Sequence, residues 1–211
     1  MKKNRRPSFQ LLLVLALLAV SLQGCIQMAV VGVGAAVVSA VDRRTTGAQI
    51  DDEGIELRAT NRVSERFSDK VHVNITSYNR SVLVTGEVPN ENIKMEIEKI
   101  VTSTPNVRVI NELQVAGLAS LTSRASDATI TGTVKARFLD AGKFNPLLVK
   151  VVTEASVVYL MGMVTESEAA AAVEIARKTS GVRKVVKVFE SCKPTDAVCA
   201  PPKPKAEEQK K

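Results

Sequence analysis

The sequence contains very few of the residue types from which enzyme active sites are built. Among 211 residues there is no tryptophan, aromatic residues make up only 3%, and the single histidine is His72. His72 falls at an outward position of a predicted strand, and we expect no cysteine or carboxylate cluster near it. A catalytic triad or a zinc site needs more partners than this, and no P-loop, nucleophile elbow or dinucleotide fingerprint is present. The sequence therefore predicts a non-enzymatic protein with no cofactor and no metal.

Long apolar runs and large apolar side chains are also scarce. Valine and alanine supply most of the hydrophobic content, so any core is thin, and 211 residues allow one or two small domains. The apolar run of residues 11–20 is too short for a stable transmembrane span. The charge-free tract of residues 26–41 is also short of the ~20 residues that cross a bilayer. We interpret it as a tether near the membrane, with a second membrane-embedded element as the alternative.

The formal net charge of +7 suggests a nucleic-acid partner until its position along the chain is considered. Four basic residues and no acidic one lie in residues 1–24, and five lysines lie in residues 193–211. Between these ends, residues 51–115 hold 8 basic and 11 acidic residues, whereas residues 123–190 hold 10 and 7. The two halves therefore have opposite sign, and only the second favours an anionic surface. No nucleic-acid partner is expected.

A basic start and a short apolar run are followed by Leu22, Gln23, Gly24 and Cys25, which together are typical of a secretory signal. The four residues resemble the bacterial lipobox, which implies cleavage between Gly24 and Cys25 and acylation of Cys25. An ordinary signal peptide with an incidental cysteine is the alternative. Three acyl chains would hold the protein on a membrane far more firmly than one. Because residue 26 is Ile and not Asp, the sorting rule that this resemblance implies favours the outer membrane, facing the periplasm.

The remainder of the chain contains one pattern twice. A helix face is followed by two alternating strands, a second helix and a last strand, at offsets of 75 or 76 residues between the copies. In the first copy, Asp51 or Asp52 is the candidate N-cap of the opening helix. In the second copy, a capping box spans Thr165 to Glu168. The predicted segments are a signal peptide 1–24, acylated Cys25 and tether 25–50, first domain 51–115, linker 116–126, second domain 127–190, and disordered tail 191–211.

Each copy has a glycine inside its second strand, Gly86 in residues 81–91 and Gly162 in residues 157–168. A glycine weakens a strand, so it marks a bulge or a close approach of another backbone. We therefore interpret both as structural glycines. A hairpin followed by a crossover helix predicts an α+β fold in which each α-β-β-α-β unit has a three-stranded mixed sheet with both helices on one face.

Two such units, each with a glycine-containing strand and a valine-rich last strand, resemble tandem BON domains. With the lipobox, residues 42–52 and residues 159–166, the chain resembles the OsmY-like family of dual-BON outer-membrane lipoproteins over residues 11–190. The resemblance implies a periplasmic, non-enzymatic protein. It also implies binding of anionic phospholipid, of the phosphatidylglycerol type, through the second domain, and support of outer-membrane integrity and division-site processes. A scaffold for envelope-assembly or cell-wall proteins, with incidental lipid contact, is the alternative.

The first helix of the second domain carries the residues that distinguish the two copies. Leu139 lies opposite Ser64 of the first copy, and Lys135 lies opposite Thr60. A leucine among cations is suited to the lipid headgroup boundary; packing against the first domain or the linker is the alternative. In the family an aromatic residue occupies the position of Thr129, and Phe144 is the compensating aromatic here. The predicted lipid-binding residues are Thr129, Lys135, Arg137, Phe138, Leu139, Lys143 and Phe144.

Two cysteines lie near the C-terminus, Cys192 and Cys199. The periplasm is oxidising, so they can close a small disulfide loop, with two free thiols as the alternative. Their spacing is not that of a redox motif, so no redox role is expected.

Overall fold

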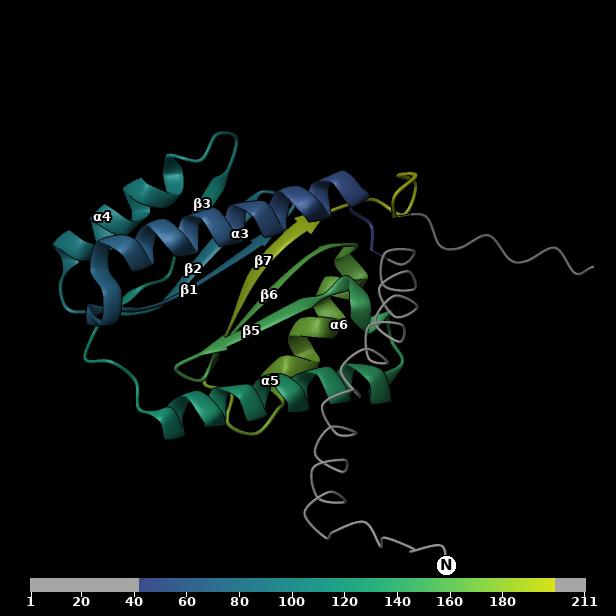
Figure 1. Cartoon of the computed structure of the whole chain (residues 1–211). Coiled ribbons are helices and arrows are strands. Elements are labelled where there is room, and N and C mark those ends of the chain that lie inside the picture. The colour runs from purple at the N-terminus through teal and green to yellow at the C-terminus, as the bar shows by residue number, and fades with distance from the viewer. Residues whose placement is uncertain (1–41, 200–211) are drawn as a thin grey trace, which may run out of the picture. The chain divides into compact units, whose positions relative to one another are not determined.

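The computed structural model describes residues 42–199, which form two α-β-β-α-β units (Figure 1). The predicted α+β class, with two tandem units of this order, is confirmed. Three predictions lie outside the described residues: the signal peptide, acylation of Cys25, and the character of residues 26–41 and 200–211. Within residues 42–199, no helix is both long enough and apolar enough to cross a membrane.

The first domain packs two helices on one face of its sheet, as expected (Figure 1). The hairpin strands are antiparallel, and the crossover places the next strand parallel to β2. The expected last strand is interrupted at the buried Leu113, so two short strands both pair with β2. The elements are α3 (Thr46–Phe67), β1 (His72–Tyr78), β2 (Ser81–Val88), α4 (Glu91–Thr102), β3 (Arg108–Asn111) and β4 (Gln114–Val115).

The second domain repeats this topology, with an antiparallel hairpin and a parallel third strand. The predicted capping box is confirmed: the Thr165 side chain accepts from the Glu168 backbone, and the Glu168 side chain accepts from the Thr165 backbone. The elements are α5 (Leu121–Ala141), the short 3-10 helix η2 (Pro146–Leu148), β5 (Lys150–Glu154), β6 (Val157–Val164), α6 (Glu166–Arg177) and β7 (Lys184–Ser191).

Both strand glycines lie where another backbone approaches closely. A Cβ added to Gly86 would overlap the carbonyl oxygen of His72, and one added to Gly162 would overlap that of Leu148. Their φ values of 119° and 156° are also ones that side-chain-bearing residues rarely adopt. These contacts explain why the strand pattern is broken at the same place in both domains.

The expected N-cap role of Asp51 or Asp52 is wrong, because α3 begins earlier and is capped by Thr45, whose side chain accepts from Ala48 N. Asp52 lies inside the helix and is buried. Its carboxylate accepts from the backbone N–H groups of Asn79 and Arg80 at 2.7 and 2.8 Å. A buried aspartate therefore holds the two left-handed residues of the β1–β2 turn in place.

A second hydrophobic core lies between the domains. The face of each sheet that its own helices leave uncovered contributes to one cluster, formed by Tyr78, Leu83, Val157, Tyr159, Met161 and Val188. As a result every residue of β2 is buried. The apolar residues at 157, 159, 161 and 163 signal this arrangement, because a strand covered on both faces is apolar at every position.

Several predicted boundaries change because flanking segments fold onto the domains. Residues 42–50, assigned to the tether, are helical from Thr46, and Arg43 binds Glu168 and the carbonyl of Met163 in the second domain. The linker is shorter than expected, since α5 starts at Leu121 with Ser120 as its cap. The first residues of the assigned tail are ordered by a disulfide between Cys192 and Cys199.

Candidate functional site

Helix α5 presents a narrow buried face and a wide exposed one. Asp127, Ile130, Val134 and Phe138 are buried against the sheet at intervals of three and four residues. The helix ends at Gly142, whose left-handed conformation lets its N–H reach the Leu139 carbonyl. These constraints fix which residues of α5 face outward.

Lys135, Leu139 and Asp140 are exposed at the C-terminal end of α5, and Lys143 is exposed just after it. Leu139 is 69% exposed, so it does not pack against the first domain or the linker within the described residues. Helical spacing of four residues places Lys135 one turn before Leu139, on the same side of the helix. This end of α5 therefore exposes an apolar side chain that lies between two lysines in the sequence, with one acidic residue, Asp140, next to it.

Phe138 and Phe144 do not belong to that surface. Phe138 is fully buried, Phe144 is 9% exposed, and their rings meet edge to face with centroids 5.0 Å apart. The pair fixes the loop after α5 to the domain core. Phe144 therefore cannot supply the aromatic contact that replaces the one expected at Thr129, because its ring is already packed inside the domain.

The side chains of Arg137 and Thr129 are hydrogen-bonded within the protein. The guanidinium of Arg137 donates to the carbonyl of Lys178 at 2.5 Å and to the hydroxyl of Thr179 at 3.2 Å. It therefore satisfies a carbonyl at the C-terminal end of α6. The Thr129 hydroxyl donates to the Ala125 carbonyl one turn earlier. Of the seven predicted lipid-binding residues, Lys135 and Lys143 are the exposed cations that make no such contact within residues 42–199.

One further apolar residue was missed by the sequence reasoning. Leu147, in η2, is 48% exposed and follows Lys143 by four residues. This segment is too short for helical or strand periodicity to show which side of Leu147 faces solvent. The sequence indicates only that the residue follows Pro146 in a connecting segment. Four exposed residues at the end of α5 and in the segment after it, Lys135, Leu139, Lys143 and Leu147, are called the α5 end surface.

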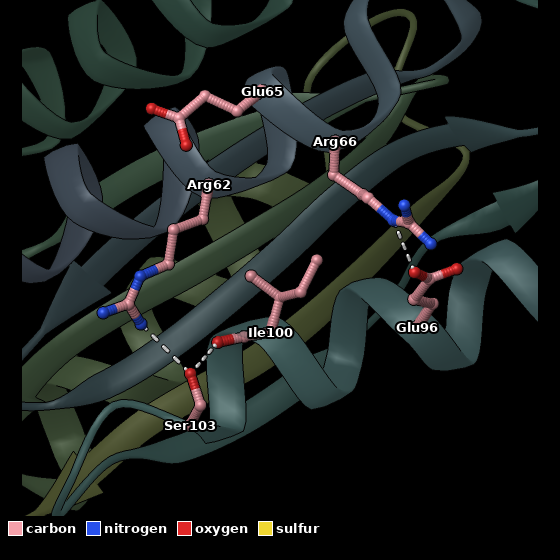
Figure 2. Close-up of a pocket in the computed structure, with 6 residues that line it drawn as sticks. All are labelled: Arg62, Glu65, Arg66, Glu96, Ile100 and Ser103. Carbon is pink, nitrogen blue, oxygen red and sulfur yellow. Dashed lines mark hydrogen bonds and ion pairs between the residues drawn. The ribbon is translucent and has the colours of Figure 1, made fainter.

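A groove in the first domain offers a different candidate site, between α3 and α4 (Figure 2). Its volume is about 680 Å³, and its charges are two arginines and two glutamates. Arg66 pairs with Glu96 at 2.8 Å, and Arg62 donates to Ser103 at 3.0 Å. Because the charges balance and both arginines have partners, this groove has no excess of either sign with which to select an anion.

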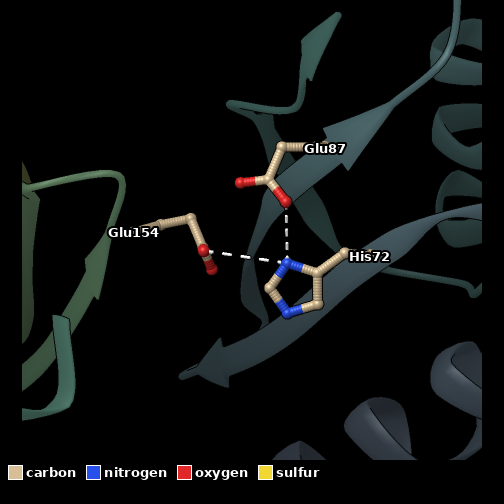
Figure 3. A group of neighbouring side chains, drawn as sticks. All are labelled: His72, Glu87 and Glu154. Carbon is tan, nitrogen blue, oxygen red and sulfur yellow. Dashed lines mark hydrogen bonds and ion pairs between the residues drawn. The ribbon is translucent and has the colours of Figure 1, made fainter. Parts of the chain in front are cut away.

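His72 has a different environment from the one the sequence suggested (Figure 3). Its Nδ1 lies 2.9 Å from Glu87 Oε2 and 3.8 Å from Glu154 Oε1, so the expected absence of nearby carboxylates is wrong. Glu87 is its cross-strand partner in the β1–β2 register, whereas Glu154 comes from the second domain. Burial raises the pKa of Glu154, and the charge of nearby Glu87 raises it further. The hydrogen bond from Asn74 and the nearby His72 act in the opposite direction but do not cancel this effect.

The model of the BON domain matches residues 51–117 and 126–192. The chain is 40% identical over 172 residues to the outer membrane lipoprotein DolP of Haemophilus influenzae, covering 80% of this chain and 89% of that protein. It is 30% identical over 152 residues to the 21 kDa hemolysin of Actinobacillus pleuropneumoniae, covering 71% of this chain and 78% of that protein.

Similarity to solved structures is weak. CdsD, a structural protein of the type III secretion system of Chlamydia trachomatis, aligns at 12% identity with a TM-score of 0.26, over 65% of this chain and 62% of that chain. Its C-terminal domain aligns at 13% identity with a TM-score of 0.28, over 63% of this chain and 95% of that chain.

Proposed function

The chain belongs to the BON domain family, in the two-domain group related to DolP, and from this premise we propose that it is an outer-membrane lipoprotein that binds anionic phospholipid. In this proposal acylated Cys25 anchors the protein on the periplasmic face of the membrane. The second domain then contacts the lipid headgroups, and that contact supports outer-membrane integrity and division-site processes. The protein does no chemistry in this role.

The observation that carries the proposal is the exposure of Leu139 among cations at the end of α5. A single exposed leucine is ordinary on a protein surface, so what distinguishes this one is its combination with Lys135, one turn before it on the same helix. Amphipathic surfaces of this kind lie in the headgroup boundary, with the apolar residue inserted and the lysines at the phosphates. A neutral lipid could also bury the leucine, but only anionic headgroups attract the two lysines. The lysines therefore favour anionic lipid.

The expected affinity of this surface is low without the anchor. Burying a leucine contributes about 2 kcal/mol, and each lysine near an anionic membrane contributes about 1 kcal/mol. A total of about 4 kcal/mol corresponds to a dissociation constant near 1 mM. An acyl anchor removes most of this limitation, because it holds the surface at high effective concentration beside the lipid. The anchor thus supplies residence, and the α5 end surface supplies orientation and headgroup preference.

Vesicle co-sedimentation tests the proposal without the anchor. The folded unit from Asp42 onward contains both domain cores, so residues 42–211 are the suitable protein. We expect it to sediment with phosphatidylglycerol vesicles, less with phosphatidylcholine vesicles, and less again as salt rises. Leu139→Glu should lower the bound fraction at least about fivefold, since it removes the apolar contact and adds a like charge to the membrane.

Ser64→Glu is the matched control, because Ser64 occupies the equivalent exposed position of the first domain. It adds the same charge to the other domain and should leave vesicle binding unchanged. Equal losses in the two variants would mean that only net charge matters. No vesicle binding by the parent protein would instead favour a scaffold that binds envelope-assembly or cell-wall proteins.

A further inference from the structure

Three metal-binding side chains from two different domains meet at the interface between the sheets (Figure 3). His72 and Glu87 face each other across the β1–β2 hairpin, and Glu154 ends β5 of the other domain. One ligand atom from each residue lies within 4.8 Å of the other two. The glutamate side chains are 6% and 5% exposed, and the histidine is 16% exposed.

The two carboxyl groups of the cluster have no lysine or arginine to pair with in residues 42–199. Within these residues, the only ionisable partner of Glu87 and Glu154 is His72. The remaining donors are neutral: the Asn74 amide to Glu154 Oε2 at 2.6 Å, and the Ala119 N–H to Glu87 Oε2 at 3.1 Å. Two nearly buried carboxyl groups therefore share one imidazole and have no cationic side chain beside them. Buried charges are normally paired or coordinate a metal.

One carboxylate oxygen points into the cluster without a hydrogen bond. Glu154 Oε1 accepts no hydrogen bond within the described residues, and it lies 3.8 Å from His72 Nδ1. Its partner oxygen is held by Asn74, so the carboxylate is fixed in this orientation. Glu154 Oε1 keeps some access to solvent, so it is open both to water and to a metal ion as a ligand.

We propose that His72, Glu87 and Glu154 bind a zinc ion that links the two BON domains. One imidazole nitrogen and two carboxylates are ligands that zinc uses, with Zn–N near 2.0 Å and Zn–O near 2.1 Å. At tetrahedral vertices such ligand atoms lie about 3.4 Å apart. The observed separations of 2.9 and 3.8 Å from Nδ1 lie on either side of this value. Water completes the fourth position.

The ion takes the place of the hydrogen bond between His72 Nδ1 and Glu87 Oε2, and the proton shared there is released to solvent. The Asn74 amide and the Ala119 N–H stay on the carboxylates as supporting donors. Because the ligands come from both domains, separation of the sheets would break the site. Zinc therefore stabilises the closed two-domain arrangement and not either domain alone. This role is independent of lipid binding.

The test uses the full chain in detergent micelles, with the disulfide formed and metal removed by EDTA and dialysis. Titration with ZnCl₂ in a calorimeter should show one site per chain with a dissociation constant of about 1 µM or tighter. Zinc at one hundred times this constant should raise the melting temperature by about 5 °C or more. His72→Ala and Glu154→Gln should each weaken binding at least tenfold and remove the melting shift.

Glu65→Gln is the control, since Glu65 is an exposed carboxylate that lines the groove between α3 and α4 and is not a member of the cluster. It should bind zinc as the parent does. In EDTA, Glu154→Gln should melt at or above the parent temperature, because the amide removes repulsion; its lost zinc response then cannot come from unfolding. Absence of zinc binding to the parent overturns the proposal and leaves a histidine–carboxylate hydrogen bond. Undiminished binding in both cluster variants also overturns it, by placing the metal elsewhere.

Discussion

The first helix of each domain has a buried aspartate at the equivalent position, Asp52 and Asp127, but the two carboxylates have different partners. Asp127 accepts from the backbone N–H groups of Ala155 and Ser156, the left-handed residues of its own hairpin turn. Asp52 accepts the two equivalent N–H groups and also bonds the Ser77 hydroxyl and Arg44. The contacts that both aspartates make hold the hairpin turn of each domain. The bond from Asp52 to Arg44 also ties the segment before the first domain to that turn.

The same division holds for the rest of the repeat. Positions that match between copies, such as Gly86 and Gly162, serve the fold of their own domain. Positions that differ lie on surfaces, such as Leu139, for which the first domain has the exposed Ser64. In a duplicated protein the differences between copies therefore indicate where function resides.

The largest expected effect comes from adding a side chain at either strand glycine. Gly162→Val and Gly86→Val each force a Cβ against a backbone carbonyl and a disfavoured φ, so each should lower the free energy of unfolding by about 3 kcal/mol or more. Urea unfolding measures this. Gly162→Val should also abolish vesicle binding, because the second domain no longer supports α5.

Gly132→Ala is the matched control for the glycine substitutions. Gly132 lies inside α5, where an added Cβ meets no atom within 4 Å. It should raise the free energy of unfolding by about 0.5–1 kcal/mol through helix propensity. If Gly162→Val keeps the parent free energy of unfolding and still binds vesicles, Gly162 does not have the structural role assigned to both strand glycines.

The next effect separates the two buried aspartates. Burial raises the pKa of Asp52, but hydrogen bonds from Ser77, Arg80, Asn79 and Arg44 more than offset this, so the pKa is lowered. The ionised form therefore stabilises the fold above the unfolded-state pKa near 4. That stability is lost as pH falls through the lower folded-state pKa.

Asp52→Asn should cost about 2–3 kcal/mol at pH 7, and Asp127→Asn, with fewer partners, about 1–2 kcal/mol. The Asp52 variant should also lose less stability between pH 5 and pH 2 than the parent, as measured by urea unfolding at each pH. An unchanged acid dependence in Asp52→Asn would show that this carboxylate does not carry the effect.

A smaller effect is expected at Arg43, and the second domain has no arginine at the equivalent position. Its guanidinium binds both oxygens of Glu168 at 2.7 and 3.0 Å and the Met163 carbonyl at 3.0 Å. Arg43→Ala should lower the free energy of unfolding by about 1–2 kcal/mol, whereas Arg58→Ala, at an exposed position of α3, should change it by less than about 0.5 kcal/mol.

The same substitution has a local signature. Burial raises the pKa of Glu168, and the hydrogen bond from Arg43 is the largest influence that lowers it, leaving it below its usual value. In Arg43→Ala the pKa of Glu168 should therefore rise, as followed by NMR titration of its carboxyl. A pKa that stays low would assign the shift to the Thr165 capping contacts instead.

Much of the fold could be predicted because its signals are local. The duplicated order of helices and strands, the capping box at Thr165 and the two structural glycines all follow from short periodic patterns. The helix start was missed because the N-cap at Thr45 lies before the first periodic apolar residue. Residue type alone also does not distinguish a buried aspartate from one that caps a helix.

The candidate sites were less accessible from the sequence. Phe144 was expected at the lipid surface, yet its packing against Phe138 depends on how the loop after α5 folds back. The pairing of His72 with Glu87 follows from the hairpin register, which counting from the turn would have shown. The approach of Glu154 does not, because it depends on two sheets meeting face to face.

The sequence by itself determined the two repeated units, their element order and the glycines that they require, because backbone propensity and period-two or period-3.6 patterning are properties of neighbouring residues. Only the tertiary structure decided that Leu139 is exposed while Phe138 and Phe144 are buried, and that His72 meets a glutamate from the other domain. Those outcomes depend on packing between segments tens of residues apart, for which no local pattern carries the information.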